Sequence, residues 1–166
     1  MTDQNADQKL SHVDATGKAK MVDVSDKPTT TRKALAEDKV IVSDELAQAI
    51  TANSLKKGNL LEVARLAGIQ VAKRTDELIP LCHSLPLDGL NITAELQDNR
   101  VVITAEAITS AKTGVEMEAY TAVAVAALTV IDMGKAIDRG MVIESIRLLS
   151  KTGGQKGDYQ APPLQT

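Results

Sequence analysis

The sequence predicts an α+β fold in which helices cover one face of an antiparallel sheet. From about residue 29 onward, segments of strand and helix character follow in the order strand, helices, strand, strand, helix, strand. This is the order of a ferredoxin-like domain, whose helices lie on one side of the sheet. The second observation is a long, mostly apolar helix from Thr113 to Gly140, which other parts of the protein or a second subunit must cover.

Length and composition predict one domain with an aliphatic core. The chain has 166 residues, and its hydrophobic fraction of 43% is ordinary for a globular protein. We expect a flexible N-terminal tail at residues 1–10, a single α+β domain at 11–159 and a flexible C-terminal tail at 160–166. The core must be aliphatic, because the chain has no Phe or Trp and only two Tyr.

The same composition argues against several kinds of partner. A net charge of −3 gives no general attraction to nucleic acid or to anionic membranes, and few aromatic rings are available to stack bases. Cys82 is the only cysteine, and His12 and His83 are the only histidines, so we expect no structural metal site. The polar N-terminal segment lacks the apolar core of a signal peptide, which predicts a cytoplasmic protein.

The first half of the chain predicts strands and then helices. Residues 19–25 alternate and suggest a short strand, while 29–42 mixes strand and helix formers, and we expect it to be extended. Ser43 precedes two acidic residues and predicts the start of a helix. A second helix is expected over 59–78, with Gly68 on its packed face allowing close approach of a neighbour.

The second half predicts the remaining strands around the long helix. Residues 90–96 and 100–108 have strand character and are joined by a short polar turn, and 141–150 forms another strand after the helix. At the start of the long helix, Thr113 and Glu116 have the spacing of a capping box, which accounts for this glutamate.

The charges on the long helix pose a geometric problem. Every residue from Ala119 to Ile131 is Ala, Val, Ile, Leu, Thr or Tyr, yet Glu118 precedes this stretch and Asp132 and Lys135 follow it. Charges on a buried helix are costly unless they are paired or used. Glu118 and Asp132 lie ~21 Å apart along the helix axis. Either they serve different sites, or one site is assembled from two copies of the protein.

Four side chains are candidates for chemistry or binding. Asp132 and Lys135 lie on one helix face and would tune each other's proton affinity as an acid/base pair; the alternative is a surface ion pair. Glu118 suits a donor-rich group such as a guanine-like edge, or else interacts with the helix N-terminus. His83 is a ligand-binding group or a satisfied core histidine, and Cys82 is expected to be a buried small residue rather than a nucleophile.

Several basic segments predict a polyanionic small-molecule ligand. Residues 151–157, KTGGQKG, resemble a phosphate cradle, in which glycines let backbone N–H groups converge between lysines. The segment lacks P-loop spacing, and alone it is also compatible with an exposed turn. Lys56-Lys57 and Lys73-Arg74 add further positive charge in a mildly acidic chain. These patterns do not identify a reaction.

Six ordered motifs resemble one enzyme family. They are MVDVS (21–25), ARLAGIQVAKRT (64–75), LIPLCH (78–83), TGVEMEA (113–119), IDMGKA (131–136) and IRLLSKTGG (146–154). Together they resemble the cyclic pyranopterin monophosphate synthase family, the molybdenum cofactor biosynthesis protein C, over residues 12–159. The resemblance implies a lyase that converts the GTP-derived (8S)-3′,8-cyclo-7,8-dihydroguanosine 5′-triphosphate to cyclic pyranopterin monophosphate and releases pyrophosphate.

The resemblance also implies an assembly and a set of site residues. The subunit would be ferredoxin-like and would form a homo-hexamer, a trimer of dimers, with the active site at a subunit interface. No cofactor is implied as a requirement, although Mg²⁺ is compatible with the triphosphate. The implied catalytic residues are Asp132, Lys135 and Lys57. The implied substrate-binding residues are Leu81, Cys82, His83, Met117, Glu118, Arg32, Lys73 and Lys151.

Four positions depart from the family pattern. Ser84 replaces a common Pro, Gly134 replaces a frequent Cys, and Gln155-Lys156 replaces the usual Lys-Ser, which leaves phosphate contacts at the last two positions open. Two other classes also stay open. A non-catalytic, nucleotide-binding regulatory module of the same fold needs no acid/base pair, and a nucleotide phosphohydrolase would require a divalent-metal site.

Overall fold

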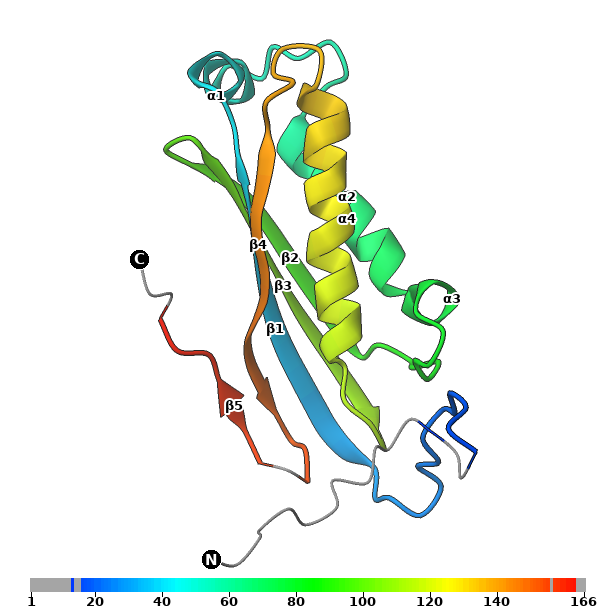
Figure 1. Cartoon of the computed structure of the whole chain (residues 1–166). Coiled ribbons are helices and arrows are strands. Elements are labelled where there is room, and N and C mark those ends of the chain that lie inside the picture. The colour runs from blue at the N-terminus through cyan, green and yellow to red at the C-terminus, as the bar shows by residue number, and fades with distance from the viewer. Residues whose placement is uncertain (1–12, 14–15, 156, 164–166) are drawn as a thin grey trace, which may run out of the picture.

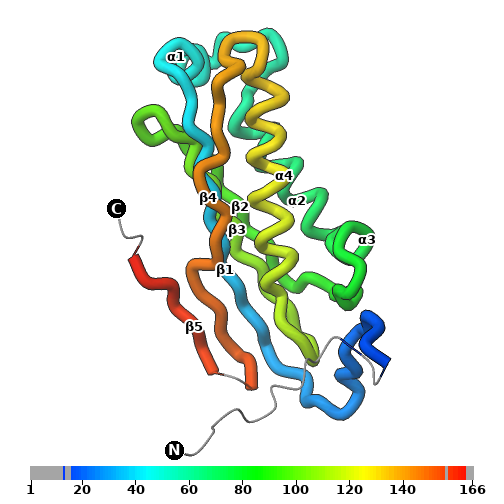
Figure 2. The backbone as a smooth tube through the Cα atoms, viewed as in Figure 1, coloured from blue at the N-terminus to red at the C-terminus, as the bar shows by residue number. Residues whose placement is uncertain are grey.

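The protein is a five-stranded antiparallel sheet with helices on one face, as Figure 1 and Figure 2 show. The structure, a computed structural model, describes residues 13, 16–155 and 157–163. The predicted tail at 1–10 lies outside these residues, as do 164–166 of the predicted C-terminal tail. The elements are β1 (Thr30–Ile41), α1 (Asp44–Thr51), α2 (Leu60–Ala72), α3 (Thr75–Leu78), β2 (Gly89–Gln97), β3 (Arg100–Ala111), α4 (Glu116–Gly134), β4 (Val142–Thr152) and β5 (Tyr159–Gln160).

The α+β prediction is confirmed by this arrangement. The strand order across the sheet is β2-β3-β1-β4-β5, and every neighbouring pair is antiparallel. The first four strands in chain order are therefore arranged β2-β3-β1-β4, with helices in the two crossovers, which is compatible with a ferredoxin-like fold. β5 is a two-residue strand at the β4 edge.

The centre of the sheet is built from alternating small apolar residues. β1 pairs with β3 over its whole length, from Thr30 opposite Ala111 to Ile41 opposite Arg100. Successive strand side chains point to opposite faces, so every second residue of β1 faces the helices and is buried. Ala34 and Ala36 are among these residues. Their short side chains let α4 pack closely on the sheet.

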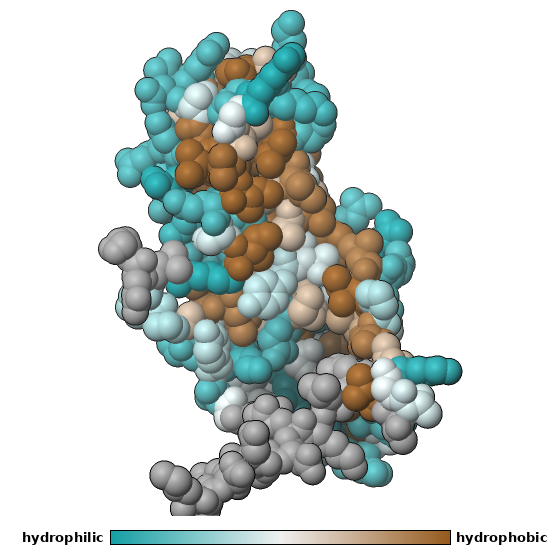
Figure 3. Space-filling view, in the orientation of Figure 1, coloured by the Kyte–Doolittle hydropathy of each residue, from teal (hydrophilic) through white to brown (hydrophobic). Residues whose placement is uncertain are grey.

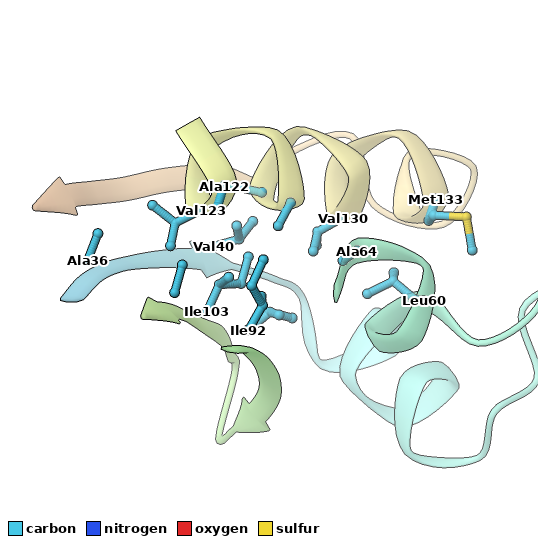
Figure 4. Close-up of a cluster of buried hydrophobic side chains, with 14 of the residues drawn as sticks. Ala36, Val40, Leu60, Ala64, Ile92, Ile103, Ala122, Val123, Val130 and Met133 are labelled. Atoms are coloured by element: carbon cyan, nitrogen blue, oxygen red, sulfur yellow. The ribbon is translucent and has the colours of Figure 1, made fainter. Parts of the chain in front are cut away.

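α4 is the central element of the core (Figure 4). It packs against β1 and β3, and α2 packs beside it and covers β2. Because the helix is apolar on most faces, ten of its residues are buried. Gly68 of α2 confirms the expected close approach: a Cβ there would lie 2.9 Å from Ile92 Cδ1 and 3.0 Å from the Ala122 carbonyl oxygen.

The predicted start and end of the long helix are both wrong. α4 begins at Glu116 and ends at Gly134, and its N-cap is Val115, which makes no side-chain capping bond. The expected capping box does not form, because the Glu116 carboxylate instead accepts a hydrogen bond from Lys151 Nζ at 2.9 Å. A charge-assisted bond to an ammonium group replaces the bond to a backbone amide.

Two further predictions need correction. The expected helix over 59–78 is divided into α2 and α3, because the chain turns at Lys73-Arg74 and the buried Thr75 hydroxyl donates to the Ala72 carbonyl. Residues 19–25 do not form a strand; the segment has a single bridge, between Val13 and Ala19. Alternating residues form a strand only where a neighbouring strand completes their backbone hydrogen bonds.

The length and composition of α4 would by themselves allow it to cross a membrane, and it is the one such helix among the described residues. In the apolar stretch of this helix, 56% of the residues are buried inside the protein, as in a core helix.

A buried carboxylate lies among the core side chains of β1. Asp38 of β1 is fully buried, with Ile103 of β3 and Ile146 of β4 as its register partners. Neither of its carboxylate oxygens has a hydrogen-bond partner. Burial, assisted by the negative charge of Glu37, raises the pKa of Asp38 to about 6.

The titration of Asp38 predicts a pH-dependent stability. Its pKa is higher in the folded than in the unfolded chain, so its destabilising charge develops as the pH rises from about 4 to above 6. Asp38→Asn cannot ionise. As the pH rises from 4 to 8, the free energy of unfolding of Asp38→Asn should therefore increase by about 2 kcal/mol relative to that of the wild type. Denaturant titration at both pH values measures this difference. The same difference in unfolding free energy at both pH values would contradict the raised pKa of Asp38. Asp98→Asn in the exposed β2–β3 turn is the control.

Candidate functional site

Three charged side chains meet at the C-terminal end of α4. Lys135 Nζ lies 2.7 Å from Asp132 Oδ1, as expected for residues three apart on a helix. Lys57 Nζ lies 2.8 Å from Asp132 Oδ2 and also donates to the Asp132 carbonyl oxygen at 2.8 Å. The carboxylate therefore accepts from two ammonium groups. All three side chains are open to solvent in the single chain.

A tight turn places Lys57 beside the end of α4. The turn lies between α1 and α2, and Leu55 anchors it in the core. Gly58 follows Lys57 with a φ of +92°, a conformation that favours glycine, and Asn59 then caps α2. These local features direct the Lys57 side chain to Asp132, which lies 75 residues further along the chain.

The two lysines fix the charge of Asp132. Hydrogen bonds from Lys135 and Lys57, together with their positive charges, lower the pKa of Asp132 to about 2. Such a carboxylate is ionised at every physiological pH and is a weak base by itself. In this arrangement it orients two proton-bearing amines at one point.

A second group of predicted residues lines one cavity at the other end of α4. The cavity has a volume of about 470 Å³. Its walls come from the loop after α3, the first turn of α4 and the segment before β1. His83 Nε2 donates to the Val22 carbonyl oxygen at 2.8 Å, which leaves Nδ1 available. The predicted residues that line it are Leu81, Cys82, His83, Met117 and Glu118.

Burial sets the protonation of two residues in this cavity. Glu118 is only 4% exposed, and burial raises its pKa, with a smaller contribution from the charges of Glu116 and Asp76. Cys82 is partly buried rather than fully buried as predicted. This partial burial and the neighbouring Glu118 still raise the pKa of its thiol. The thiol form is therefore favoured, which does not suit a nucleophile. An apolar wall with one buried carboxyl group suits a flat heterocycle bearing N–H donors.

A second, cationic cavity adjoins the His83 cavity. Lys27, Thr113, Gly114 and Glu116 line both cavities. The cationic cavity contains five basic side chains, from the start of β1, from the segments before β1 and α4, and from β4. Of these, Arg32 and Lys151 were predicted, whereas Lys27, Lys33 and Lys112 were not. Their clustering suits a ligand with several negative charges.

Arg32 is a built feature of the cationic cavity. The residue is only 6% exposed, and its Nε has no hydrogen-bond partner within the protein. The predicted phosphate cradle at 151–157, called the glycine turn below, passes close to this side chain: a Cβ on Gly154 would lie 3.2 Å from Arg32 Nη1. A buried guanidinium with an unused donor is a favourable partner for an anionic oxygen.

The remaining predicted residue, Lys73, lies elsewhere. It is exposed at the C-cap of α2 and does not line either cavity. The Lys57–Asp132–Lys135 group does not meet the two adjoining cavities in one chain, because Asp132 lies ~21 Å along α4 from Glu118, which lines the His83 cavity. Among the described residues, no three His, Cys, Asp or Glu side chains cluster as metal ligands would.

The fold and the cavities define an α+β protein with sites for a polyanionic, heterocyclic small molecule. Residues 21–154 match the model of the MoaC family, and the chain belongs to this family. It is 54% identical over 156 residues to the cyclic pyranopterin monophosphate synthase of Methylobacterium sp. (strain 4-46), covering 93% of this chain and 98% of the relative. It is 51% identical over 158 residues to the synthase of Parvibaculum lavamentivorans, covering 94% and 99%.

The pairing at Asp132 predicts a measurable shift. In Lys57→Ala the carboxylate loses one of its two ammonium partners, so the pKa of Asp132 should rise from about 2 toward the ordinary aspartate value. A carbon-detected NMR titration of the Asp132 carboxyl group measures this. Lys56→Ala, which removes a neighbouring charge without touching Asp132, is the control. An unshifted Asp132 in Lys57→Ala would show that the contact is absent in solution.

Proposed function

We propose that this chain catalyses a step of molybdenum cofactor biosynthesis. It converts (8S)-3′,8-cyclo-7,8-dihydroguanosine 5′-triphosphate to cyclic pyranopterin monophosphate and releases pyrophosphate. The single observation that carries this proposal is the convergence of Lys57, Asp132 and Lys135 at one point, within a chain of the MoaC family. A binding module has no need for such a group.

The chemistry of the reaction accounts for the types of side chain. Opening the five-membered ring of the purine and closing a pterin ring require repeated proton transfers. We assign these transfers to the catalytic group of Lys57, Asp132 and Lys135, in which the carboxylate holds the two amines in place. Forming the cyclic phosphate requires the charge of the triphosphate to be neutralised, and we assign that role to the cationic cavity.

The two adjoining cavities support a position for each half of the substrate. The base-derived ring would occupy the cavity of Leu81, Cys82, His83, Met117 and Glu118, and the triphosphate would lie toward Arg32 and Lys151. Lys73 would contribute positive charge to the site only from another subunit. We propose no resident cofactor, with Mg²⁺ as an optional companion of the triphosphate.

A shared site between subunits would bring the groups together. The catalytic group and the cavities lie at opposite ends of α4, so a single chain leaves each of them incomplete. Figure 3 shows apolar side chains gathered on the face that carries β4 and α4, where Leu128, Val142 and Ile146 are exposed. Such a patch favours association. We propose a homo-oligomer, a hexamer built as a trimer of dimers, acting in the cytoplasm.

Replacement of the catalytic carboxylate tests the function. Asp132→Asn keeps the shape of the side chain but loses the charge that holds the two amines, so product formation should fall by at least about a hundredfold. Purified protein is incubated with the substrate, and pterin product and pyrophosphate are measured together. Lys57→Ala should behave alike.

The control is Glu62→Gln, which removes the carboxylate of another exposed i, i+3 ion pair on α2 and should leave turnover unchanged. Near-normal turnover by Asp132→Asn would refute the catalytic role of this carboxylate. Pyrophosphate without pterin would indicate a phosphohydrolase, and ligand binding without either product in the wild type would indicate a regulatory module.

A further inference from the structure

A carboxylate lies unexpectedly close to the cationic cavity. Asp158 stands between the glycine turn, whose Gly154 and Gly157 line this cavity, and strand β5. An acidic side chain near an anion site weakens binding through repulsion unless it serves another purpose. Asp158 does not line the cavity. Its hydrogen bond shows what that purpose is.

Asp158 holds the peptide at the base of the glycine turn. Its Oδ1 accepts a hydrogen bond from the Gly153 N–H at 3.2 Å. The Thr30 hydroxyl donates to the Gly153 carbonyl oxygen at 2.9 Å. Both polar groups of Gly153 are therefore bound by side chains from outside the turn.

The backbone at Gly153 has little freedom to adopt another position. Its φ is +84°, and a Cβ there would lie 2.0 Å from the Thr31 carbonyl oxygen, so the turn rests directly on the start of β1. The next residue, Gly154, packs against the buried Arg32 guanidinium. The orientation of Gly153 thus determines how the turn closes over Arg32.

Asp158 is itself held in place by β5. Tyr159 pairs with Lys151 of β4, and the Ala161 N–H donates to the Leu149 carbonyl oxygen at 2.7 Å. The residue after Asp158 is therefore fixed opposite a lysine that lines the cavity. β5 is too short to add much to the sheet, but it fixes the end of the glycine turn.

We propose that Asp158 is a positioning residue, which acts through Gly153 to hold the glycine turn in the conformation that binds the phosphates. The proposal rests on the proposed function for the identity of the ligand. It assigns Asp158 no contact with the substrate. It requires a hydrogen-bond acceptor at this position rather than a negative charge.

The test measures binding of inorganic pyrophosphate by calorimetry and steady-state turnover by the full chain. Asp158→Ala loses the acceptor, so pyrophosphate binding should weaken about tenfold, with KM raised by a similar factor and kcat within about twofold of wild type. Asp158→Asn keeps an acceptor oxygen and should bind within about twofold of wild type. Thr30→Val, which removes the other bond to Gly153, should weaken binding in the same direction.

Several outcomes would overturn the proposal. Wild-type affinity in Asp158→Ala would do so, as would tighter binding in both Asp158 variants, which would mean that the carboxylate acts through its charge. Failure of wild-type protein to bind pyrophosphate would also overturn it. Glu45→Ala, which removes a charge on α1, is the control and should change nothing. Absence of pterin product together with intact pyrophosphate binding would instead refute the proposed function alone.

Discussion

The packing of α4 on the sheet is the constraint on which the rest of the structure depends. The helix is apolar on most faces and lies against β1 and β3 through small side chains, so its position and direction are fixed over its length. A rigid, buried rod cannot bend to bring its ends together. Whatever is attached to those ends is held at a set separation, ~21 Å for Glu118 and Asp132.

The two ends of α4 carry carboxyl groups in different surroundings. At the C-terminal end, Asp132 is exposed and ionised between two amines, and its pKa is low. At the N-terminal end, Glu118 is buried, and its pKa is raised. Two carboxyl groups on one helix thus have opposite proton affinities, set by solvent exposure and by their partners. In the proposed function, the ionised group that holds the two amines and the carboxyl group that faces the heterocycle would be complementary parts of one shared site.

The glycine turn, which is proposed to bind the phosphate groups, is also held in place by the sheet. It is supported by β1 beneath it, through Thr30 and Thr31, and by the β4–β5 pairing behind it. The cationic cavity is therefore made from strands that α4 already holds in register. Its lysines come from segments far apart in sequence, and only the sheet brings them together.

Local sequence patterns predicted those features that depend on neighbouring residues. The order of strands and helices, the shared face of Asp132 and Lys135 and the close packing at Gly68 all follow from periodicity or spacing. The start of α4 was mispredicted, because Glu116 bonds to Lys151, which lies 35 residues further on. The division of the second helix at Lys73-Arg74 was missed for a similar reason, because a buried threonine bond there outweighs helix propensity.

Long-range pairing limited what could be predicted about the site. Lys57 lies 75 residues from Asp132, and no local pattern relates a loop lysine to the end of a distant helix. Only the family resemblance indicated it. Lys27 and Lys112 were missed because single lysines are common on protein surfaces. The one available indication was that turn-forming residues follow each lysine, Pro28 after Lys27 and Gly114 two residues after Lys112.

Complementation between two inactive variants tests the shared site most directly. Asp132→Asn removes the proposed catalytic carboxylate, and Glu118→Gln alters the cavity proposed to bind the ring. Each homo-oligomer should therefore be strongly impaired. If each site draws Glu118 from one subunit and Asp132 from another, mixed assemblies contain some sites with both residues intact. Co-expressed subunits should then recover about a quarter of wild-type turnover. Mixed assemblies, verified by mass, that remain as inactive as the parent variants would contradict the account.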